Sequence, residues 1–442
     1  MRGQSKRGGD RGAIIIHVAF ALLGLLAFTA FVIDYGVMWV SRRQAQNVAD
    51  AAALAGAISL MRDGGSRDVA TASALHYAAN NPVWGQGNSA ANVRIAFSGP
   101  DPGGGPDVDL PPCGTSPGCV RVDVYRNMPE RDNSGTILGN PIPTFFGHLV
   151  GISEQGVRAT ATAETAAGNS IRCLLPFAVM DRWADNHDEN PDPTYFANDP
   201  ITNPGIDGWS MNDMFQPGNG DVYIAPYEGN TGHTGWKVDD DYGRQLILKD
   251  GDPGNYSAGW AMEIDLPDST GSNDYSWNIE HCNTQPVGIA EALTPCTEVD
   301  EPIGCMSVKT GVSQGPTSQG IGDMSRGLVS QDPDAHWDPD ANAIVGGGGM
   351  SSPRIRPIVI IDINHYMSQG CSGTTCIGKV ANIIGFFAEG MCNDVTLDEG
   401  LACEDPNKDV VGRIVTLPGT YVAGTGDVEE SAAFVKVVRL VR

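Results

Sequence analysis

The sequence predicts an α+β protein. A single N-terminal transmembrane helix continues into a long exported helix, followed by a small antiparallel sheet and then a larger disulfide-bearing β-rich domain. Three observations predict this class: an uncharged apolar run near the N-terminus, an alanine-rich, proline-free stretch soon after it, and ten cysteines that all follow residue 112. The predicted boundaries are a basic cytoplasmic tail (residues 1–12), the transmembrane helix (13–40), the exported helix with its small sheet (41–168) and the β-rich exported domain (169–442).

The composition narrows the class of protein. Of 442 residues, 41% are hydrophobic and 18% are charged, which fits a folded, loop-rich chain and excludes a coiled coil or an intrinsically disordered chain. The net charge of −25 argues against a nucleic-acid partner, because affinity for phosphates depends on basic residues. Residues 1–62 hold seven basic and three acidic residues, a net +4, so the remainder, with 21 and 50, carries −29. This asymmetry indicates that the two parts lie in different surroundings.

The apolar run covers residues 13–33 and has no formal charge. A helix of this length spans a hydrocarbon core of about 30 Å. A cleaved signal peptide is the alternative, but its apolar core is roughly 7–15 residues long and ends at a small-x-small site. Here the first such site, residues 55–57, lies more than twenty residues beyond the run, which favours an uncleaved anchor. His17, near the cytoplasmic end, either reaches the lipid headgroups or forms a hydrogen bond between helices.

The orientation follows from the flanking charges and from the cysteines. Four basic residues precede the run and two follow it, and this bias favours a cytoplasmic N-terminus. The basic residues are Arg2, Lys6, Arg7 and Arg11 before the run and Arg42 and Arg43 after it. Cysteines beyond residue 112 are typical of an oxidising compartment. We therefore expect a single-pass protein of a bacterial inner membrane, with lipid around the helix and the body in the periplasm or outside the cell.

An even number of cysteines in an exported body indicates disulfide bonds. Close spacing predicts three local bridges: Cys113–Cys119, Cys371–Cys376 and Cys392–Cys403. The other four would form two bridges in an order that the sequence leaves open: Cys173, Cys282, Cys296 and Cys305. A zinc site is the alternative, but there is no Cys-x-x-Cys pair and no histidine at ligand spacing, so no metal ligand is predicted.

Residues 41–61 contain no proline and many alanines, so the membrane helix is expected to continue through them. Small residues recur at three- and four-residue steps and form a stripe that allows close approach of another helix. They are Ala45, Ala49, Ala52 and Gly56, with Asp34 and Asp50 flanking. The pattern has two interpretations: high helix propensity alone, or a packing face for a partner helix. A second helix, capped by Ser66, is expected to reach about Asn80.

Period-two alternation predicts three half-buried antiparallel strands, at residues 93–98, 120–125 and 157–164. Residues 143–150 (PTFFGHLV) predict a short amphipathic helix between the last two strands. A long helix followed by a small sheet is the plan of a pilin.

The N-terminal residues resemble a known family. Arg11-Gly12, Asp34-Tyr35-Gly36, Arg42-Arg43, Gln46-Asn47 and the run 49–55 (ADAAALA) are similar, in this order, to the N-terminal segment of the TadE/TadG-like proteins of the Flp (tight adherence) pilus-assembly system. A weaker resemblance extends to about residue 167. The resemblance implies a structural or assembly role through protein–protein binding, with other Tad/Flp pilus-assembly proteins or pseudopilins as partners.

Two departures refine this resemblance. Prepilin-like members place a glutamate five residues after the processing glycine, where this chain has His17, which favours the permanently anchored TadG-like branch. Some TadG-like proteins carry a von Willebrand A-type domain with an Asp-x-Ser-x-Ser metal motif. The nearest candidate here, residues 362–366, lacks both serines, so that domain is not expected.

The larger body has short β-rich apolar segments between loops rich in Gly, Pro, Asp and Asn, which predicts a β-sandwich or a barrel pinned by disulfides. The segments are residues 246–248, 358–363, 383–387, 410–417 and 434–441. The motifs of P-loop proteins and zincins and the Gly-x-Gly-x-x-Gly pattern of dinucleotide-binding proteins are absent from the sequence. The Gly-x-Ser-x-Gly pattern occurs at residues 114–118 and 311–315, but so short a pattern does not by itself identify a serine hydrolase. We therefore expect no enzyme, no catalytic residue and no cofactor.

Two acidic stretches have the alternating oxygen ligands that calcium uses. One contains Asp332, Asp334, Asp338, Asp340 and Asn342, and the other is residues 405–409. Both lack the glycine at the sixth position and the glutamate at the twelfth position of a calcium loop, so plain acidic loops are favoured. The alternative function is an anchored adhesin or ligand-binding protein, stabilised by calcium.

Overall fold

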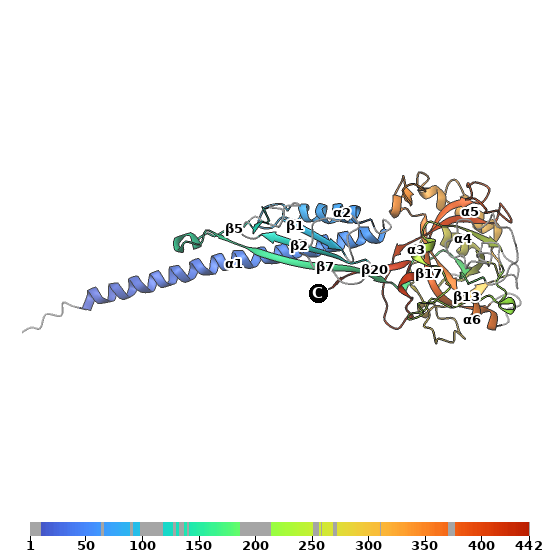
Figure 1. The fold of residues 1–442 in the computed structure, drawn as a ribbon, viewed down its shortest axis with the longest axis horizontal. Helices are drawn as coiled ribbons and strands as arrows, with labels where there is room; N and C mark the ends of the chain where they lie inside the picture. The colour runs from blue at the N-terminus through green and yellow to red at the C-terminus, as the bar shows by residue number, and fades with distance from the viewer. Residues whose placement is uncertain are drawn as a thin grey trace, which may run out of the picture. The chain divides into compact units, whose positions relative to one another are not determined.

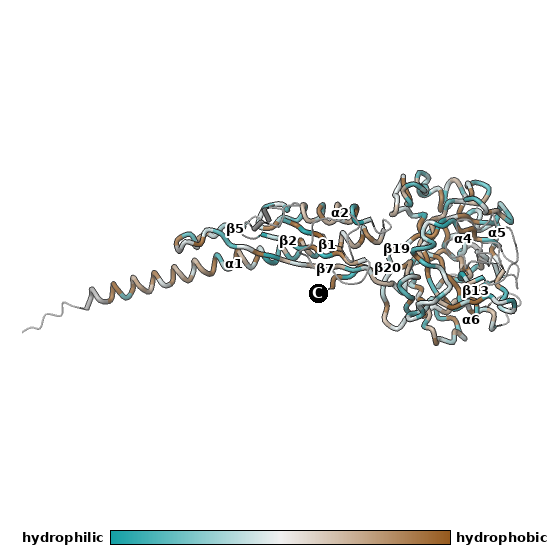
Figure 2. Tube along the Cα trace, viewed as in Figure 1, coloured by the Kyte–Doolittle hydropathy of each residue, from teal (hydrophilic) through white to brown (hydrophobic). Residues whose placement is uncertain are grey.

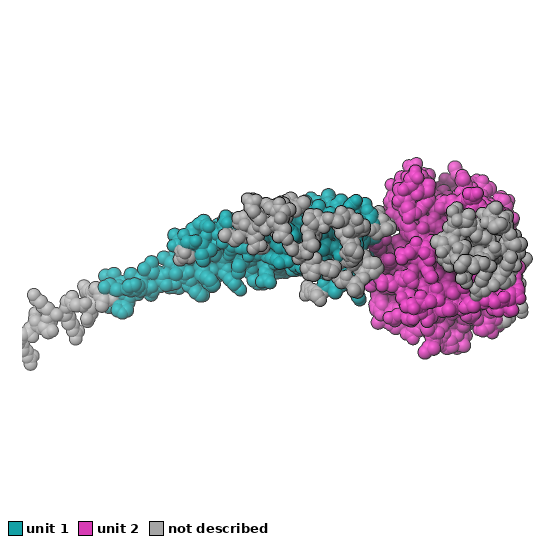
Figure 3. All heavy atoms as spheres, in the orientation of Figure 1, with its two compact units in different colours: residues 1–60, 65–165, 438–442 teal, residues 61–64, 166–437 magenta. Residues whose placement is uncertain are grey.

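The computed structural model describes residues 10–62, 66–88, 92–97, 118–126, 130–131, 137–138, 141–185, 214–250, 256–257, 259–267, 272–309, 311–369 and 376–441. The chain divides into two compact units, coloured separately in Figure 3. Unit 1 comprises Met1–Leu60, Gly65–Thr165 and Val438–Arg442, and unit 2 comprises Met61–Gly64 and Ala166–Val437. An α+β chain with a long apolar helix and a β-rich body is what the sequence predicts.

The predicted continuous helix is confirmed as α1 (Asp10–Arg62), which has 53 residues (Figure 1). The second predicted helix is α2 (Arg67–Asn80). Ser66 is its N-cap, and its hydroxyl accepts a hydrogen bond from the amide of Val69 at 3.5 Å. The buried side of α2 consists of alanines at four-residue steps, Ala70, Ala74 and Ala78, so α2 can pack at short range.

The sheet of unit 1 is antiparallel and follows the predicted alternation. β1 (Val93–Phe97) pairs with β2 (Val120–Arg126), and β2 pairs with β7 (Val157–Ala167). The alternation is clearest in the first eight residues of β7, where every second residue is buried. The C-terminal part of β20 (Val435–Val441) contributes Arg439, which forms an ion pair with Glu164 at 2.7 Å.

Two small hairpins complete unit 1. β3 (Glu130–Arg131) pairs with β4 (Ile137–Leu138), and β5 (Ile142–Pro143) pairs with β6 (Glu154–Gln155). The predicted amphipathic helix over residues 143–150 is wrong in its first half. Only a short 3-10 helix, η1 (Gly147–Val150), forms there, because Pro143 belongs to a strand and the next amides bond elsewhere.

The sheet of unit 2 closes into a barrel, which decides between the two predicted alternatives. Strands β16, β17, β13, β11 and β9 pair in turn, and β9 pairs with β16 to complete the ring. Strands β10 and β18 pair with each other and with β11 and β17 respectively. The bounds are β9 (Phe177–Met180), β10 (Gln245–Asp250), β11 (Trp260–Ile264), β13 (Cys305–Lys309), β16 (Ile355–Ile361), β17 (Cys376–Met391) and β18 (Val410–Val415).

Short elements surround the barrel. The minor strands are β8 (Ser170–Ile171) with β12 (Val287–Gly288), β14 (His336–Asp338) with β15 (Ala343–Val345), and β19 (Leu417–Pro418) with β20. The helices are α3 (Val238–Asp241), α4 (Ser272–Glu280), α5 (Gln314–Gly322), α6 (Ile363–Ser368), and the 3-10 helices η2 (Pro217–Asn219), η3 (Glu301–Ile303), η4 (Leu328–Gln331), η5 (Gly349–Ser351) and η6 (Glu430–Ala432).

The barrel core consists of β-branched and aromatic side chains. Residues 358–361 on β16 and 383–384 on β17 are fully buried, together with Trp260 and Phe177. Such side chains favour the extended backbone and fill the interior of a small barrel. Four of the five predicted apolar segments of the body therefore lie in barrel strands, and the fifth, residues 434–441, forms β20.

Disulfides fix three parts of unit 2. Cys392–Cys403 is confirmed, and the structure resolves the order of the other four cysteines as Cys173–Cys282 and Cys296–Cys305. Cys376 is also disulfide-bonded, and its predicted partner, Cys371, lies outside the described residues. The predicted pair Cys113–Cys119 is not tested, because Cys113 also lies outside them.

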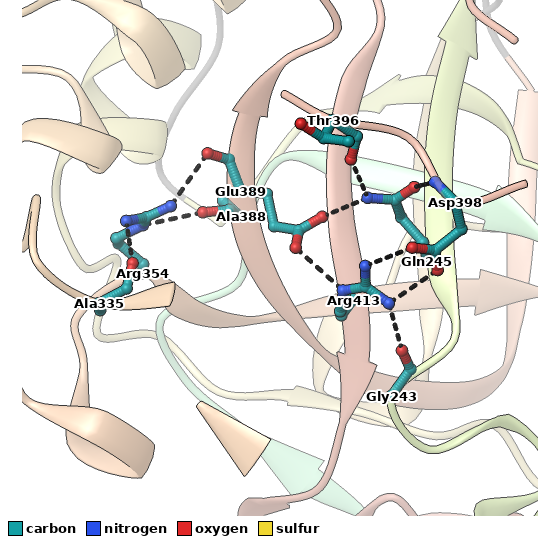
Figure 4. Close-up of polar contacts among 9 residues, drawn as sticks. All are labelled: Gly243, Gln245, Ala335, Arg354, Ala388, Glu389, Thr396, Asp398 and Arg413. Atoms are coloured by element: carbon teal, nitrogen blue, oxygen red, sulfur yellow. Dashed lines mark hydrogen bonds and ion pairs between the residues drawn. The ribbon is translucent and has the colours of Figure 1, made fainter. Parts of the chain in front are cut away.

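Polar contacts reinforce the connection between β17 and β18, residues 392–409 (Figure 4). The guanidinium of Arg413 donates to Glu389 at 2.9 Å and to both carboxylate oxygens of Asp398 at 2.7 and 2.8 Å. The side chain of Gln245 donates to Glu389 at 2.6 Å and accepts from the amide of Asp398 at 2.8 Å. These bidentate and charge-assisted bonds hold the connection against the barrel wall.

A second arginine, Arg354, binds main-chain carbonyls (Figure 4). Its guanidinium donates to the carbonyls of Ala388 at 2.9 Å, Ala335 at 2.7 Å and Glu389 at 3.0 Å. The group also stacks over the ring of Phe387, 4.7 Å from its centroid. Burial lowers the pKa of Arg354, but the carbonyl acceptors satisfy its donors.

Candidate functional site along helix α1

The first half of α1 exposes an apolar surface on all sides. Every side chain from residue 14 to residue 29 is exposed, including Phe20 (70%) and Leu26 (66%). Brown, the colour of hydrophobic residues, dominates this part of the helix in Figure 2. Within the described residues, α1 is a helix that has the length and the apolar composition to cross a membrane. The hydroxyl of Thr29 donates to the carbonyl of Leu25 at 2.8 Å, so it needs no external partner in an apolar medium.

The second half of α1 is different, because one side of it is buried inside unit 1. The change begins at Val37 (8% exposed) and continues through Ser41 (0%), and it then includes all four residues of the predicted stripe. The stripe residues are Ala45, Ala49, Ala52 and Gly56. The three alanines belong to one apolar cluster together with the alanines of α2 and the valines of β1, β2 and β7, and Gly56 lies beside this cluster.

Gly56 shows how short the packing distance is. A Cβ atom at this position would lie 3.0 Å from Cγ1 of Val120, 3.5 Å from the carbonyl oxygen of Ala70 and 3.5 Å from Cβ of Ala74. The small-residue face therefore lets α2 and β2 approach α1 closely. The expected contact of this face with a partner helix stays a prediction, and it would require the face to open.

Asp34, which flanks the stripe, binds a distant loop. Its carboxylate accepts hydrogen bonds from the amides of Phe145 (2.7 Å), Phe146 (3.0 and 3.3 Å) and Gly147 (2.7 Å). The side chain of Gln155 donates to the carbonyl of Asp34 at 3.3 Å. A carboxylate that binds three successive amides at the start of η1 acts as a cap for that turn. Asp34 thereby fastens the β5–β6 hairpin to α1.

Asp50, the other flanking acid, has a local role. It accepts a hydrogen bond from the side chain of Gln46 at 2.8 Å, one helical turn away. The same Gln46 amide donates to the carbonyl of Thr160 on β7 at 3.0 Å. Asp50 therefore orients a side chain that joins α1 to the sheet.

The sequence prediction missed a buried carboxylate on the sheet, Asp123. It is fully buried and accepts hydrogen bonds from Arg121 at 3.0 Å, from Arg158 at 3.1 Å and from the hydroxyl of Thr160. Arg158 also lies over the ring of Tyr125, 4.9 Å from its centroid, and burial followed by the charge of Asp123 raises the pKa of Tyr125. The signal was available, because Arg121 and Asp123 lie on one face of a predicted strand.

Unit 2 contains a second carboxylate that sequence reasoning did not single out, Asp181. It follows β9, is fully buried, and accepts from the amides of Arg182 (2.8 Å) and Trp236 (3.1 Å) and from the hydroxyl of Tyr223 (3.0 Å). Burial raises the pKa of Asp181 to about 7, and the nearby charge of Asp362 acts in the same direction. Each oxygen of Asp181 already has donors from the protein.

Asp362 follows β16, the parallel neighbour of β9, and has a similar environment. It caps α6 through the amide of His365 at 3.0 Å and accepts from the hydroxyl of Tyr227 at 3.0 Å. The ammonium group of Lys379 lies 4.9 Å from the centroid of the Tyr227 ring. Asp181 and Asp362 therefore each connect the end of a barrel strand to a loop through a tyrosine hydroxyl, Tyr223 and Tyr227 respectively. These contacts stabilise the fold.

The carboxylates of the two acidic stretches accept hydrogen bonds from main-chain amides. Asp338 accepts from the amides of Asp340 at 2.9 Å and Ala341 at 3.2 Å, and Asp409 accepts from the amide of Asp405 at 3.0 Å. Within the described ranges, no group of three or more His, Cys, Asp and Glu side chains is placed to hold a metal ion. These oxygens stabilise turns.

A hollow of about 500 Å³ lies at the surface of unit 2, beside α5. Most of its lining side chains are polar, and Met391 is the one large apolar side chain among them. The polar lining residues are Gln314, Ser318, Gln319, Asp323, Asn393, Asp394 and Asn407.

Comparison with known proteins gives one match. Residues 12–59 match a family model described as putative Flp pilus-assembly TadE/G-like, which confirms the resemblance of the N-terminal segment. No curated protein and no solved structure matches the chain. The matched segment contains the apolar half of α1, Asp34, Asp50 and the whole small-residue stripe. This match supports a role related to the Flp pilus.

Proposed function

We propose that the chain is a single-pass, membrane-anchored assembly component of a Flp-type pilus apparatus, of the TadG-like kind, and that it acts by binding other assembly proteins. The observation that carries the proposal is the match of residues 12–59, since this segment contains both the exposed apolar half of α1 and its buried half. The apolar half holds the protein in the inner membrane, with residues 1–12 in the cytoplasm and the chain after the span outside it.

The topology is supported by charge and by disulfides. Four basic residues precede the apolar run and two follow it, and the described part of the body contains three disulfides and a further disulfide-bonded cysteine, Cys376. Membrane fractionation with and without residues 13–33 tests the anchor, and protease accessibility of the body in spheroplasts tests its side. We expect the full chain in the membrane fraction and a body cleaved from the periplasmic side. A full chain found in the cytosol with reduced cysteines would refute the proposal.

The surface of α1 that a partner can reach lies opposite the small-residue stripe. Asn47 and Ile58 are exposed there, whereas Ala49 is fully buried against the chain's own α2 and sheet. An exposed helix side next to a membrane anchor can pack against a helix of another anchored protein. We therefore place the partner contact on this side of α1.

In-cell photocrosslinking tests this placement. A photoreactive residue in place of Asn47 or Ile58 is expected to cross-link to other pilus-assembly proteins, whereas one in place of Ala49 is not. Cross-links from position 49 alone would instead support a partner helix on the small-residue stripe. Deletion of the gene should abolish pilus assembly, and normal pili in the deletion strain would contradict the proposed function.

A further inference from the structure

The β5–β6 hairpin exposes a compact group of large apolar side chains at its tip. The exposed fractions are 58% for Phe145, 39% for Phe146, 83% for Leu149 and 56% for Ile152. The tip, residues 143–153, contains no charged residue, although the chain carries a net charge of −25. Contiguous exposed apolar side chains indicate a contact surface for a protein or a membrane.

The tip has a defined conformation. The amide of Ile152 donates to the carbonyl of Gly147 at 2.9 Å, and the amide of Thr144 donates to the carbonyl of Ser153 at 3.1 Å. Gly151 adopts the left-handed conformation (φ +85°) that ends η1. The apolar side chains therefore project from a turn with its own hydrogen bonds.

The position of the tip along α1 is set by Asp34. Its carboxylate binds the amides of Phe145, Phe146 and Gly147, and it is the first charged residue after the apolar run of residues 13–33. A carboxylate is costly inside the hydrocarbon core, so Asp34 marks the boundary of the span. The tip is therefore held at the level where the helix leaves the membrane, and Figure 1 shows the hairpin beside α1.

The same level of α1 has the side chains of a membrane interface. Tyr35 is 53% exposed and Trp39 is 57% exposed, and tyrosine and tryptophan are enriched where lipid tails meet headgroups. Arg42 and Arg43, both exposed, lie about 12 Å beyond Asp34 along the helix axis, within reach of lipid phosphates.

We propose that the tip of the β5–β6 hairpin inserts its apolar side chains into the interfacial layer of the bilayer, as a second membrane contact beside the transmembrane helix. The occupant of this surface is lipid, because the surface continues the exposed apolar surface of α1 at the boundary of the span. This inference rests on the membrane anchoring proposed above. Two contacts on one membrane would limit the tilt and rotation of unit 1.

Lipid photocrosslinking of the full chain in liposomes of phosphatidylethanolamine and phosphatidylglycerol tests the proposal. A photoreactive phenylalanine analogue replaces Leu149 at the tip, Leu23 in the span, or Leu293 in unit 2, a control leucine that is 94% exposed. We expect lipid adducts at position 149 at least tenfold more abundant than at position 293.

The outcomes separate this proposal from the anchoring on which it rests. Adducts at position 23 but not at position 149 would overturn the tip contact and leave the anchor intact, whereas adducts at neither position would overturn both. Cross-links from position 149 to a protein instead of lipid would also overturn the proposal.

The role of Asp34 is tested in the same liposomes. Asp34→Ala removes the acceptor of three tip amides, so the lipid adduct at position 149 should fall severalfold while the adduct at position 23 is unchanged. Asp50→Ala is the matched control, because Asp50 bonds to Gln46 and not to the tip. An unchanged adduct at position 149 in Asp34→Ala would overturn the assignment of Asp34 as the residue that sets the depth of the tip.

Discussion

Substitution of Gly56 tests whether the small-residue face of α1 is filled by the chain's own α2 and β2. An alanine Cβ would lie 3.0 Å from Val120 Cγ1 and 3.5 Å from its next neighbours, so Val120 must shift by a few tenths of an ångström, while alanine gains about 1 kcal/mol of helix propensity over glycine. Phenylalanine adds a six-carbon ring where no space remains. Overpacking of this kind costs roughly 1–3 kcal/mol.

The expected order of stability of unit 1 is therefore Gly56→Ala equal to or above the wild type, and Gly56→Phe below it by about 2 kcal/mol, a factor of roughly 30 in the equilibrium. Hydrogen exchange of the full chain in detergent micelles measures this as lost protection of the β1 and β2 amides. The barrel strands serve as an internal reference, because they belong to a separate core. Asn47→Phe, on the exposed side of the same helix, should change stability by no more than about 0.5 kcal/mol.

Wild-type protection of β1 and β2 in Gly56→Phe would refute this reasoning, since it would mean that the face is not filled within unit 1. If that variant also failed to assemble pili, the interpretation of the stripe as a partner-packing face would replace ours. Lost protection in Asn47→Phe as large as in Gly56→Phe would show that any added ring perturbs the helix.

Three further predictions concern unit 2. Removing the Cys173–Cys282 bridge should cost more stability than removing Cys296–Cys305, because the bridged residues are 109 and 9 positions apart in the sequence. Loop entropy gives a loss of roughly 5 against 3 kcal/mol, and thermal unfolding of the two double-alanine variants compares them. Folding raises the pKa of Asp181 from 3.8 to about 7, so the protein loses stability as the pH rises through this range, by at most about 1.4 kcal/mol per pH unit. Asparagine cannot ionise, so the melting temperature of Asp181→Asn relative to the wild type should be higher at pH 8 than at pH 5. Arg413→Lys loses the bidentate bond to Asp398 and should make the β17–β18 connection more sensitive to limited proteolysis, and unchanged cleavage there would show that the ion pair does not hold this connection.

Local patterns predicted the local structure. Apolar composition and the absence of proline gave the helix over residues 10–62, and the Ser66 cap gave the start of α2. Alternation gave β1, β2 and β7 because one face of each strand packs on a core while the other faces polar surroundings. In each case the information lies within a few residues of the element itself.

The features that the sequence could not provide depend on distant partners. Closure of the barrel requires β9 to lie beside β16, which pairs Ala178 with Val359, and no local pattern specifies that contact. The disulfide order follows from the same arrangement. Asp34 was identified as a flanking residue, but the amides that it binds lie more than 110 positions away.

The helix over residues 143–150 was mispredicted for a related reason. Its apolar pattern, with Phe145, Phe146 and Leu149, suits an amphipathic helix, but those side chains are exposed, and Phe145 makes one ring contact, with Trp84 at 6.4 Å between centroids. The amides that would begin the helix bind Asp34 instead, and only the 3-10 turn remains. An apolar pattern identifies side chains that avoid water, and in a membrane-anchored protein lipid can satisfy that requirement as well as a core.

The extent of the family match has a physical explanation in the same helix. The match ends at residue 59, close to the last buried positions of α1, Leu60 and Met61, and before α2 begins. Within the match, this chain is apolar all round in the first half of α1 and has small residues on one side of the second half, with Asp34 between the two. A face of small residues lets neighbouring elements approach closely, but it does not specify which residues those elements carry. Alanines and valines in many different arrangements can pack on such a smooth surface. The elements that cover this face can therefore differ in sequence while the helix keeps a recognisable pattern, and a match confined to the helix is what this packing predicts.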